Sequence, residues 1–214
     1  MKSKAHIRYK TKDGAIVPGV TTVLNLLAKP ALVPWANRMG LQGIDTSKYV
    51  DDKADIGTLA HAMITDKLTG KETDTTDYSK NQIDLAENSC LSFWEWEKDH
   101  KIESVEFVER PLVSEAYRFG GTQDIFCRIA GKKNLIDLKT GKGGFYPEHG
   151  YQVAALKQLL IENSYNVDVV RVLNIPRAED ESFNEKICTE KSLLVWLEIF
   201  RCCLKIYNLK KEID

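Results

Sequence analysis

The stretch YRFGGTQDIFCRIAGKKNLIDLKTG, residues 117–141, contains two runs of β-type residues separated by a short break. The first run follows the pair Gly120-Gly121, which marks a bend or a close approach of another segment to the backbone. The second run begins with the apolar pair Leu135-Ile136 and ends in charged residues. Runs of this kind predict strands. The stretch therefore predicts a buried sheet that becomes polar where its second strand ends.

Three charged residues stand in these two expected strands. Asp137 and Lys139 are separated by one residue, so in a strand both side chains project from the same face, while Leu138 points into the core. If the strands pair, Asp124 joins them, and two carboxylates and one ammonium group lie within a few ångströms. Such a cluster is costly to bury unless a divalent cation neutralises it, and oxygen ligands suit magnesium or manganese. The alternative is an ordinary surface strand of alternating charge.

Helices and further strands are expected before and after this pair of strands. The pattern predicts a hairpin over 6–17, helices over 20–28, from about 34, over 51–68 and over 79–99, strands over 104–113, 117–131 and 133–141, a helix over 147–163, a strand over 167–175, an edge strand over 183–189 and a helix over 191–211. This order predicts one α/β domain over 1–214, with a mainly helical portion (1–100), a sheet core with one helix (101–189) and a C-terminal helix (190–214).

Composition excludes several classes of protein. The chain has 214 residues, 43% hydrophobic and 29% charged, which is typical of a globular domain and not of a disordered, collagenous or coiled-coil chain. Its 30 basic and 31 acidic residues give a net charge of −1, so any nucleic-acid surface must be a local one. No apolar run is long enough for a membrane span or a signal peptide. Five scattered cysteines without a CxxC pair indicate reduced thiols and a cytoplasmic location.

Two further residues are candidates for the same site. His61 ends the sequence GTLAH in the helix expected over 51–68, and Gly57, one turn earlier on the same side, would clear space beside its imidazole. A histidine at the border of an apolar stripe can equally be a structural residue. Glu109, in the strand before Asp124, is a carboxylate that could reach the same centre, and Glu106 and Glu115 compete with it for that role.

Taken in order, these motifs resemble those of the RecB-type exonucleases of the PD-(D/E)xK superfamily, a branch that includes phage-encoded exonucleases and the mitochondrial genome maintenance exonuclease. The resemblance rests on GTLAH, a glutamate, GGTQD, IDLKTG and a glutamine that opens a helix, and extends from about Gly19 to about Leu160, roughly two thirds of the chain. It implies a restriction-endonuclease-like core, a central mixed β-sheet flanked by helices, with an N-terminal helical portion.

The resemblance also implies roles for individual residues. Asp124, Asp137 and His61 would bind a divalent metal ion, Mg²⁺ or Mn²⁺, and Lys139 would be the catalytic lysine. Glu109 would be the supporting catalytic glutamate. No other cofactor-binding residues are expected.

The helix that follows these strands departs from the family pattern at one position. Gln152 matches the glutamine of the QxxxY motif, in which it would orient the lysine or contact DNA, but Leu156 replaces the tyrosine. Some relatives hold an iron–sulfur cluster with one early and three late cysteines. Cys188, Cys202 and Cys203 lack that spacing, so we expect no iron–sulfur cluster.

The sequence thus predicts a metal-dependent DNA exonuclease of phage or bacterial recombination, repair or replication, acting with a possible partner protein of those pathways. Its DNA contacts would be basic residues at phosphates and aromatic residues stacked on unpaired bases, the candidates being Arg118, Lys142, Trp35 and Tyr146. Each aromatic residue could instead be a packing residue. An endonuclease of the same fold and a non-catalytic nucleic-acid-binding module remain alternatives.

Overall fold

A five-stranded mixed sheet forms the centre of the chain, of which the computed structural model describes residues 7–213. Its strands, in spatial order, are β3 (Ile102–Ser114), β4 (Phe119–Ile129), β5 (Lys132–Thr140), β6 (Val169–Ile175) and β7 (Asn184–Ile187). Only β5 and β6 pair in parallel, joined by a helical crossover, and the other neighbours are antiparallel. The expected edge strand is β7.

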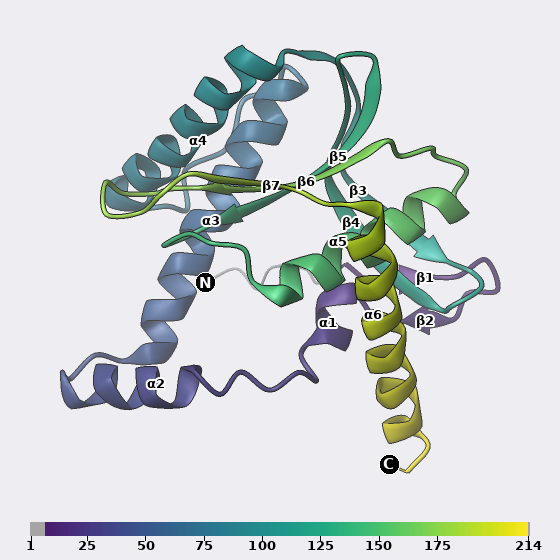
Figure 1. Ribbon diagram of the computed structural model, residues 1–214. Coiled ribbons are helices and arrows are strands. Elements are labelled where there is room, and N and C mark those ends of the chain that lie inside the picture. Colours follow the sequence, from purple (N-terminus) through teal and green to yellow (C-terminus); the bar gives the residue numbers. More distant parts are fainter. Residues whose placement is uncertain (1–6, 214) are drawn as a thin grey trace.

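Helices cover both faces of this sheet (Figure 1). The helices are α1 (Val20–Leu24), α2 (Leu32–Leu41), α3 (Thr46–Leu68), α4 (Lys80–His100), α5 (Pro147–Glu162) and α6 (Glu190–Lys211). Helices α3 and α4 pack on one face, and α1, α5 and α6 pack on the other. This arrangement confirms the expected restriction-endonuclease-like α/β core with an N-terminal helical portion.

Strand β5 supplies both hydrophobic layers because successive side chains of a strand point to opposite faces. Leu135 packs with the α5 and α6 layer, whereas Ile136 and Leu138 pack with the α3 and α4 layer. Asp137 has the same parity as Leu135, so its side chain enters the α5 side of the sheet. The central position of β5 therefore buries Asp137 completely.

Two helix boundaries differ from the expected ones. Helix α3 begins at Thr46 instead of near residue 51, because the Asp45 side chain accepts hydrogen bonds from the Ser47 and Lys48 amides and caps the helix. Helix α1 ends at Leu24 instead of residue 28, because the chain tightens into turns in which the Leu26 and Leu27 amides bond to the Val23 and Leu24 carbonyls. The small hairpin consists of β1 (Tyr9–Lys10) and β2 (Ile16–Val17), and His6, its expected first residue, lies outside the described residues.

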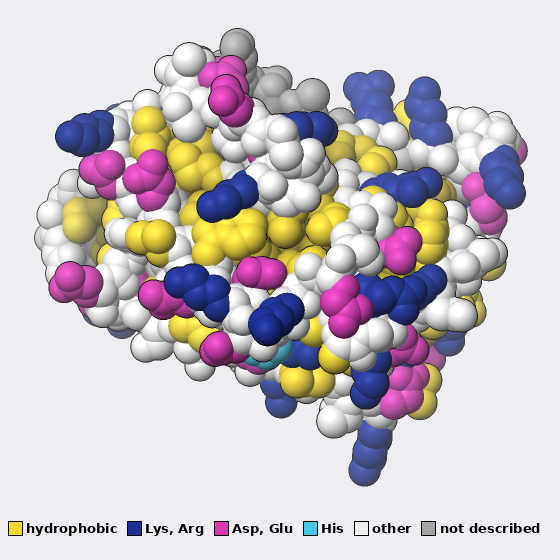
Figure 2. Space-filling model, turned by 90° about the horizontal axis from the view of Figure 1, so that it is seen from above, with side chains coloured by type: hydrophobic (Ala, Val, Ile, Leu, Met, Phe, Trp, Pro, Cys, Tyr) yellow, Lys and Arg dark blue, Asp and Glu magenta, His cyan; other side chains and the backbone are white. Residues whose placement is uncertain are grey.

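The surface carries both signs of charge. Figure 2 shows basic and acidic side chains interspersed around a group of hydrophobic ones on one face of the molecule. All five cysteines are free, and Cys202 is the exposed one. No helix among residues 7–213 has the length and apolar character needed to cross a bilayer.

Two helical glycines provide a test of the packing between α5 and α6. A Cβ atom at Gly150 would lie 2.6 Å from the Trp196 indole, whereas one at Gly40 would have no neighbour within 4 Å. We expect Gly150→Ala to lower the free energy of unfolding by about 1–3 kcal/mol, because the rigid indole must move. Gly40→Ala should leave it unchanged or raise it by up to about 1 kcal/mol. Urea unfolding measures both, and equal effects would contradict the close contact.

Candidate active site

The candidate site begins where β4 and β5 separate. Their last paired residues toward this end are Ile125 and Ile136. Beyond this pair the Leu138 amide donates a 2.8 Å hydrogen bond to Oδ2 of Asp124, so a side chain replaces the backbone partner. This bond satisfies the strand amide and fixes the Asp124 carboxylate at the opening between the strands.

Strand β3 brings a second carboxylate to the same point. Glu109 lies opposite Asp124, between the pairs Val108–Ile125 and Arg110–Gln123, and its φ of +46° is in the left-handed region. A non-glycine residue adopts that conformation at a cost, and such residues concentrate at functional sites. The irregularity at Glu109 coincides with the carboxylate cluster.

Helix α3 adds His61, which completes a group of three possible metal ligands. His61, Glu109 and Asp124 each offer one ligand atom, and these atoms lie within 4.8 Å of one another. Nδ1 of His61 is 3.8 Å from Oδ2 of Asp124. The three residues line a pocket of about 420 Å³ together with Thr58, Ala62, Thr65 and Asp66 of α3. The expected approach of His61 to Asp124 is therefore present in the structure.

The protonation of these groups suits a cation. Burial, with a contribution from Lys139, lowers the pKa of His61 to about 4, so the imidazole is neutral at pH 7 and can donate a lone pair. Desolvation, followed by repulsion from Asp124 and Asp66, raises the pKa of Glu109 to about 7. Burial raises the pKa of Asp124. A divalent cation would relieve this crowding, and two carboxylates with one imidazole fit Mn²⁺ or Mg²⁺.

Asp137 lies beside this group but has other partners. Its Oδ2 is 2.6 Å from Nζ of Lys139, and its Oδ1 accepts a 3.1 Å hydrogen bond from Nε2 of Gln152. Oδ2 has no further hydrogen bond among the described residues, so the contact with Lys139 is its sole polar contact there. Burial opposes the charge of Lys139, but Asp137 and Asp124 raise its pKa on balance. The structure thus groups Glu109, and not Asp137, with His61 and Asp124.

Gly57 has a different role from the expected one. A Cβ atom at this position would lie 2.6 Å from Oγ1 of Thr140, the residue that follows Lys139. The glycine therefore lets the end of β5 approach α3, and it does not serve mainly to clear space beside His61.

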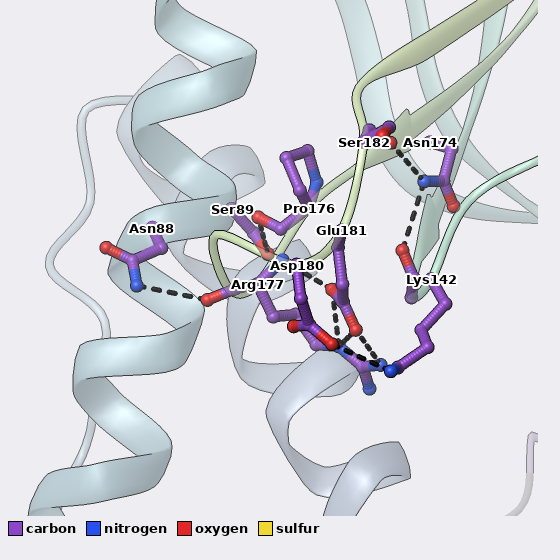
Figure 3. Close-up of polar contacts among 10 residues, drawn as sticks. Asn88, Ser89, Lys142, Asn174, Pro176, Arg177, Asp180, Glu181 and Ser182 are labelled. Atoms are coloured by element: carbon purple, nitrogen blue, oxygen red, sulfur yellow. Dashed lines mark hydrogen bonds and ion pairs between the residues drawn. The ribbon is translucent and has the colours of Figure 1, made fainter.

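The expected nucleic-acid contacts lie in different parts of the fold. Lys142 and the 58% exposed Tyr146 are in the loop between β5 and α5, and Nζ of Lys142 is 2.7 Å from Asp180 (Figure 3). Trp35 is on α2, with its ring centroid 6.2 Å from that of Tyr49. Arg118 directly precedes β4, about 20 Å from Asp124 at ~3.3 Å per residue, and pairs with Asp13. The structure does not bring Arg118 to the site.

His149 is a neighbour of the site that the sequence motifs do not reveal. It lies one turn before Gln152 on α5, and its Nδ1 accepts a hydrogen bond from the Tyr146 amide. Burial and then Lys139 lower its pKa to about 4. One feature of the sequence could have identified His149: it precedes Gln152 by three residues, and this spacing places both side chains on one face of the helix.

The fold resembles solved structures, whereas the sequence matches no protein-family model and no curated protein. A structure named as a candidate exonuclease from Eubacterium rectale is similar with a TM-score of 0.51 and 11% identity, covering 72% of this chain and 68% of the other. LHK-Exo in complex with dAMP has a TM-score of 0.42 and 14% identity, covering 76% and 87%. At these identities the first likeness shows a shared fold.

The raised pKa of Glu109 predicts a pH-dependent stability. Its ordinary value is 4.5 and its folded value is about 7, so stability linked to this group is complete below pH 4.5 and is lost as the pH rises through about 7. In EDTA, Glu109→Gln should therefore melt like the wild type near pH 4.5 and at a higher temperature near pH 8. Thermal unfolding monitored by circular dichroism measures the difference.

Glu106→Gln, the same substitution at another exposed position of β3 outside the ligand group, is the matched control for the change of side chain. Identical pH profiles for Glu109→Gln and the wild type would mean that Glu109 is not held against Asp124.

Proposed function

We propose that the chain is a metal-dependent deoxyribonuclease that hydrolyses phosphodiester bonds. The observation that carries the proposal is the convergence of His61, Glu109 and Asp124, from three elements, next to the buried Asp137–Lys139 pair. A cluster of carboxylates, a neutral imidazole and a lysine at the open end of a sheet suits phosphoryl chemistry. The fold shared with a candidate exonuclease supports the same reaction class.

The residues present fit a divalent cation. His61, Asp124 and Asp137 are the proposed ligands, and Glu109 is added because its carboxylate lies within 4.8 Å of the ligand atoms of His61 and Asp124. Oδ2 of Asp137 also fits this role, since the contact with Lys139 is its sole polar contact among the described residues and leaves room for a second partner. When bound, Mg²⁺ or Mn²⁺ would polarise the phosphate and lower the pKa of a water molecule.

The chain's own residues supply the remaining steps. Lys139, 20% exposed at its side chain, can orient the attacking water or stabilise the charge that develops on the phosphate oxygens. Gln152 holds Asp137 through its Nε2 and thereby fixes the orientation of the carboxylate beside Lys139. The complete set of Asp124, Asp137 and Lys139 favours an enzyme over a non-catalytic binding module.

The finer proposal is an exonuclease that acts on single-stranded DNA ends, in phage or bacterial recombination, repair or replication. Helix α3 contributes His61 from the helical layer, so one side of the site is covered by a helix. A covered site favours a strand that enters by a free end. Lys142 and Tyr146, at the β5–α5 loop, and Trp35 on α2 are the proposed contacts to phosphates and bases. A cytoplasmic location and a partner protein of these pathways belong to the same proposal.

Lys139 provides the direct test of the chemistry. Lys139→Gln should reduce cleavage of linear DNA in Mn²⁺ by at least about 100-fold, since the positively charged Lys139 side chain at the reacting phosphate is lost. It should also destabilise the fold, because Asp137 is then buried without its ion-pair partner. The double variant Asp137→Asn with Lys139→Gln should recover stability without activity. Gel assays and urea unfolding measure the two effects, and full cleavage by Lys139→Gln would refute the assignment.

The need for a free end is tested with matched single strands. We expect linear single-stranded DNA to be degraded and a closed circular strand of the same sequence to be largely spared. A phenol-stopped time course on both substrates, with Mn²⁺, gives the ratio of rates. Equal rates would favour the endonuclease alternative.

A further inference from the structure

The N-terminal half of α3 has an unusual inner face. The buried stripe of this helix runs through Ile56, Ala60 and Ile64, and Tyr49 and Lys53 continue the same side toward the helix start. Tyr49 is 38% exposed and Lys53 is half-buried, so this part of the stripe has no hydrophobic layer over it. Figure 1 shows this half of α3 extending beyond the sheet to α2.

Two aromatic rings and one lysine lie together on this face. The Trp35 ring of α2 lies 6.2 Å from the Tyr49 ring, and Nζ of Lys53 lies 5.6 Å from the Tyr49 ring centroid. The acids of the helix point elsewhere: Asp52 accepts a hydrogen bond from Gln82 of α4, and Asp51 and Asp55 lie on the opposite side by helical geometry. Lys53 is therefore the charged group that lies beside the two aromatic rings.

Lys142 of the β5–α5 loop is a further lysine near Tyr49. Asp180 raises the pKa of Lys142, and Tyr49 is close enough to add to that effect. The loop that carries Asp180 is firmly held (Figure 3): Arg177 forms an ion pair with Glu181, and Asn174 donates hydrogen bonds to the Gly141 and Ser182 carbonyls. The backbone at Lys142 is therefore held in place, while the ammonium group of its side chain is exposed.

The geometry of α3 connects this face to the candidate metal site. Tyr49, Lys53, Gly57 and His61 follow one another at intervals of four residues, which is one row along a helix. At ~1.5 Å per residue, Tyr49 lies about 18 Å from His61 along the axis, a distance spanned by a few nucleotides. The end of β5 packs against this row at Gly57, between Lys53 and His61, so a strand bound at Tyr49 and Lys53 would meet the end of β5 before the site.

We infer that the first turns of α3, with Tyr49 and Lys53, form the track on which a single nucleic-acid strand approaches the candidate site. The inference rests on the proposed nuclease function and adds the path of the substrate to it. The partner chemistry follows from the surface: unpaired bases stack on exposed aromatic rings, and phosphates pair with lysines. A phosphate at Lys142 would replace the Asp180 carboxylate.

Binding measured without cleavage tests the track. The fluorescence anisotropy of a labelled oligothymidine is followed in Ca²⁺, and gels of the same samples verify that the strand stays intact. Tyr49→Ala should weaken binding about five- to tenfold, the lower range for one stacked base, and Tyr49→Phe should stay within about twofold of the wild type. Lys53→Ala should reduce the slope of log K against log salt by about 0.7. Lys205→Ala, an exposed lysine on α6, is the control and should change neither.

A blunt-ended duplex tests whether this surface binds single strands in preference to double strands. Its bases are stacked on one another, so Tyr49→Ala should not weaken duplex binding, and an equal loss on both substrates would overturn the single-strand assignment. Melting temperatures of all variants show whether a loss of affinity reflects unfolding. Photo-cross-linking of a 5-bromouracil strand to Tyr49, located by mass spectrometry, should succeed in the wild type.

The track and the proposed function can fail separately. If the wild type cleaves and binds single strands but Tyr49→Ala and Lys53→Ala match it in affinity and salt slope, the track is wrong and the nuclease assignment stands. If the wild type neither binds nor cleaves nucleic acid, both are wrong.

Discussion

The burial of Asp137 is the constraint on which the rest of the site depends. A carboxylate with no exposed surface is stable only if its charge is compensated and its oxygens have partners. Lys139 supplies the charge, and Gln152 supplies a hydrogen bond. These partners come from β5 itself and from α5, so the strand, the crossover helix and the loop between them must keep one mutual arrangement.

The adjacent opening between β4 and β5 follows from a second backbone constraint. Once the strands diverge, the Leu138 amide needs an acceptor, and Asp124 provides it. One carboxylate oxygen thus serves the strand while the group remains in the pocket with His61 and Glu109. The same residue completes the hydrogen bonding of the sheet and contributes to the ligand group, which ties the stability of the fold to the composition of the site.

Most of the fold could be predicted from the sequence because local patterns determine it. Strand β5 and helix α5 have clear periodicity and end signals, and their expected bounds agree with the structure within a residue or two. The start of α3 differs from the expected one because its first turn is polar and shows no apolar pattern. The Asp45 N-cap nevertheless stabilises that turn. At the site, the approach of His61 to Asp124 was predicted from motif order. The left-handed backbone of Glu109 was not, because it arises from pairing between β3 and β4 and has no local signal such as glycine.

The residues of the site are unevenly distributed along the chain, and this has a consequence for folding. Glu109, Asp124 and Asp137 come from consecutive antiparallel strands, so contacts of short sequence separation can assemble them. His61 comes from α3 and is separated along the sequence from the three strands by the whole of α4. It reaches the three carboxylates only by closing a long loop. Docking of the helical layer and completion of the ligand group are therefore the same event. A chain whose sheet has formed but whose α3 is undocked would have the carboxylates without the imidazole, so the ligand group is complete only when both layers are in place.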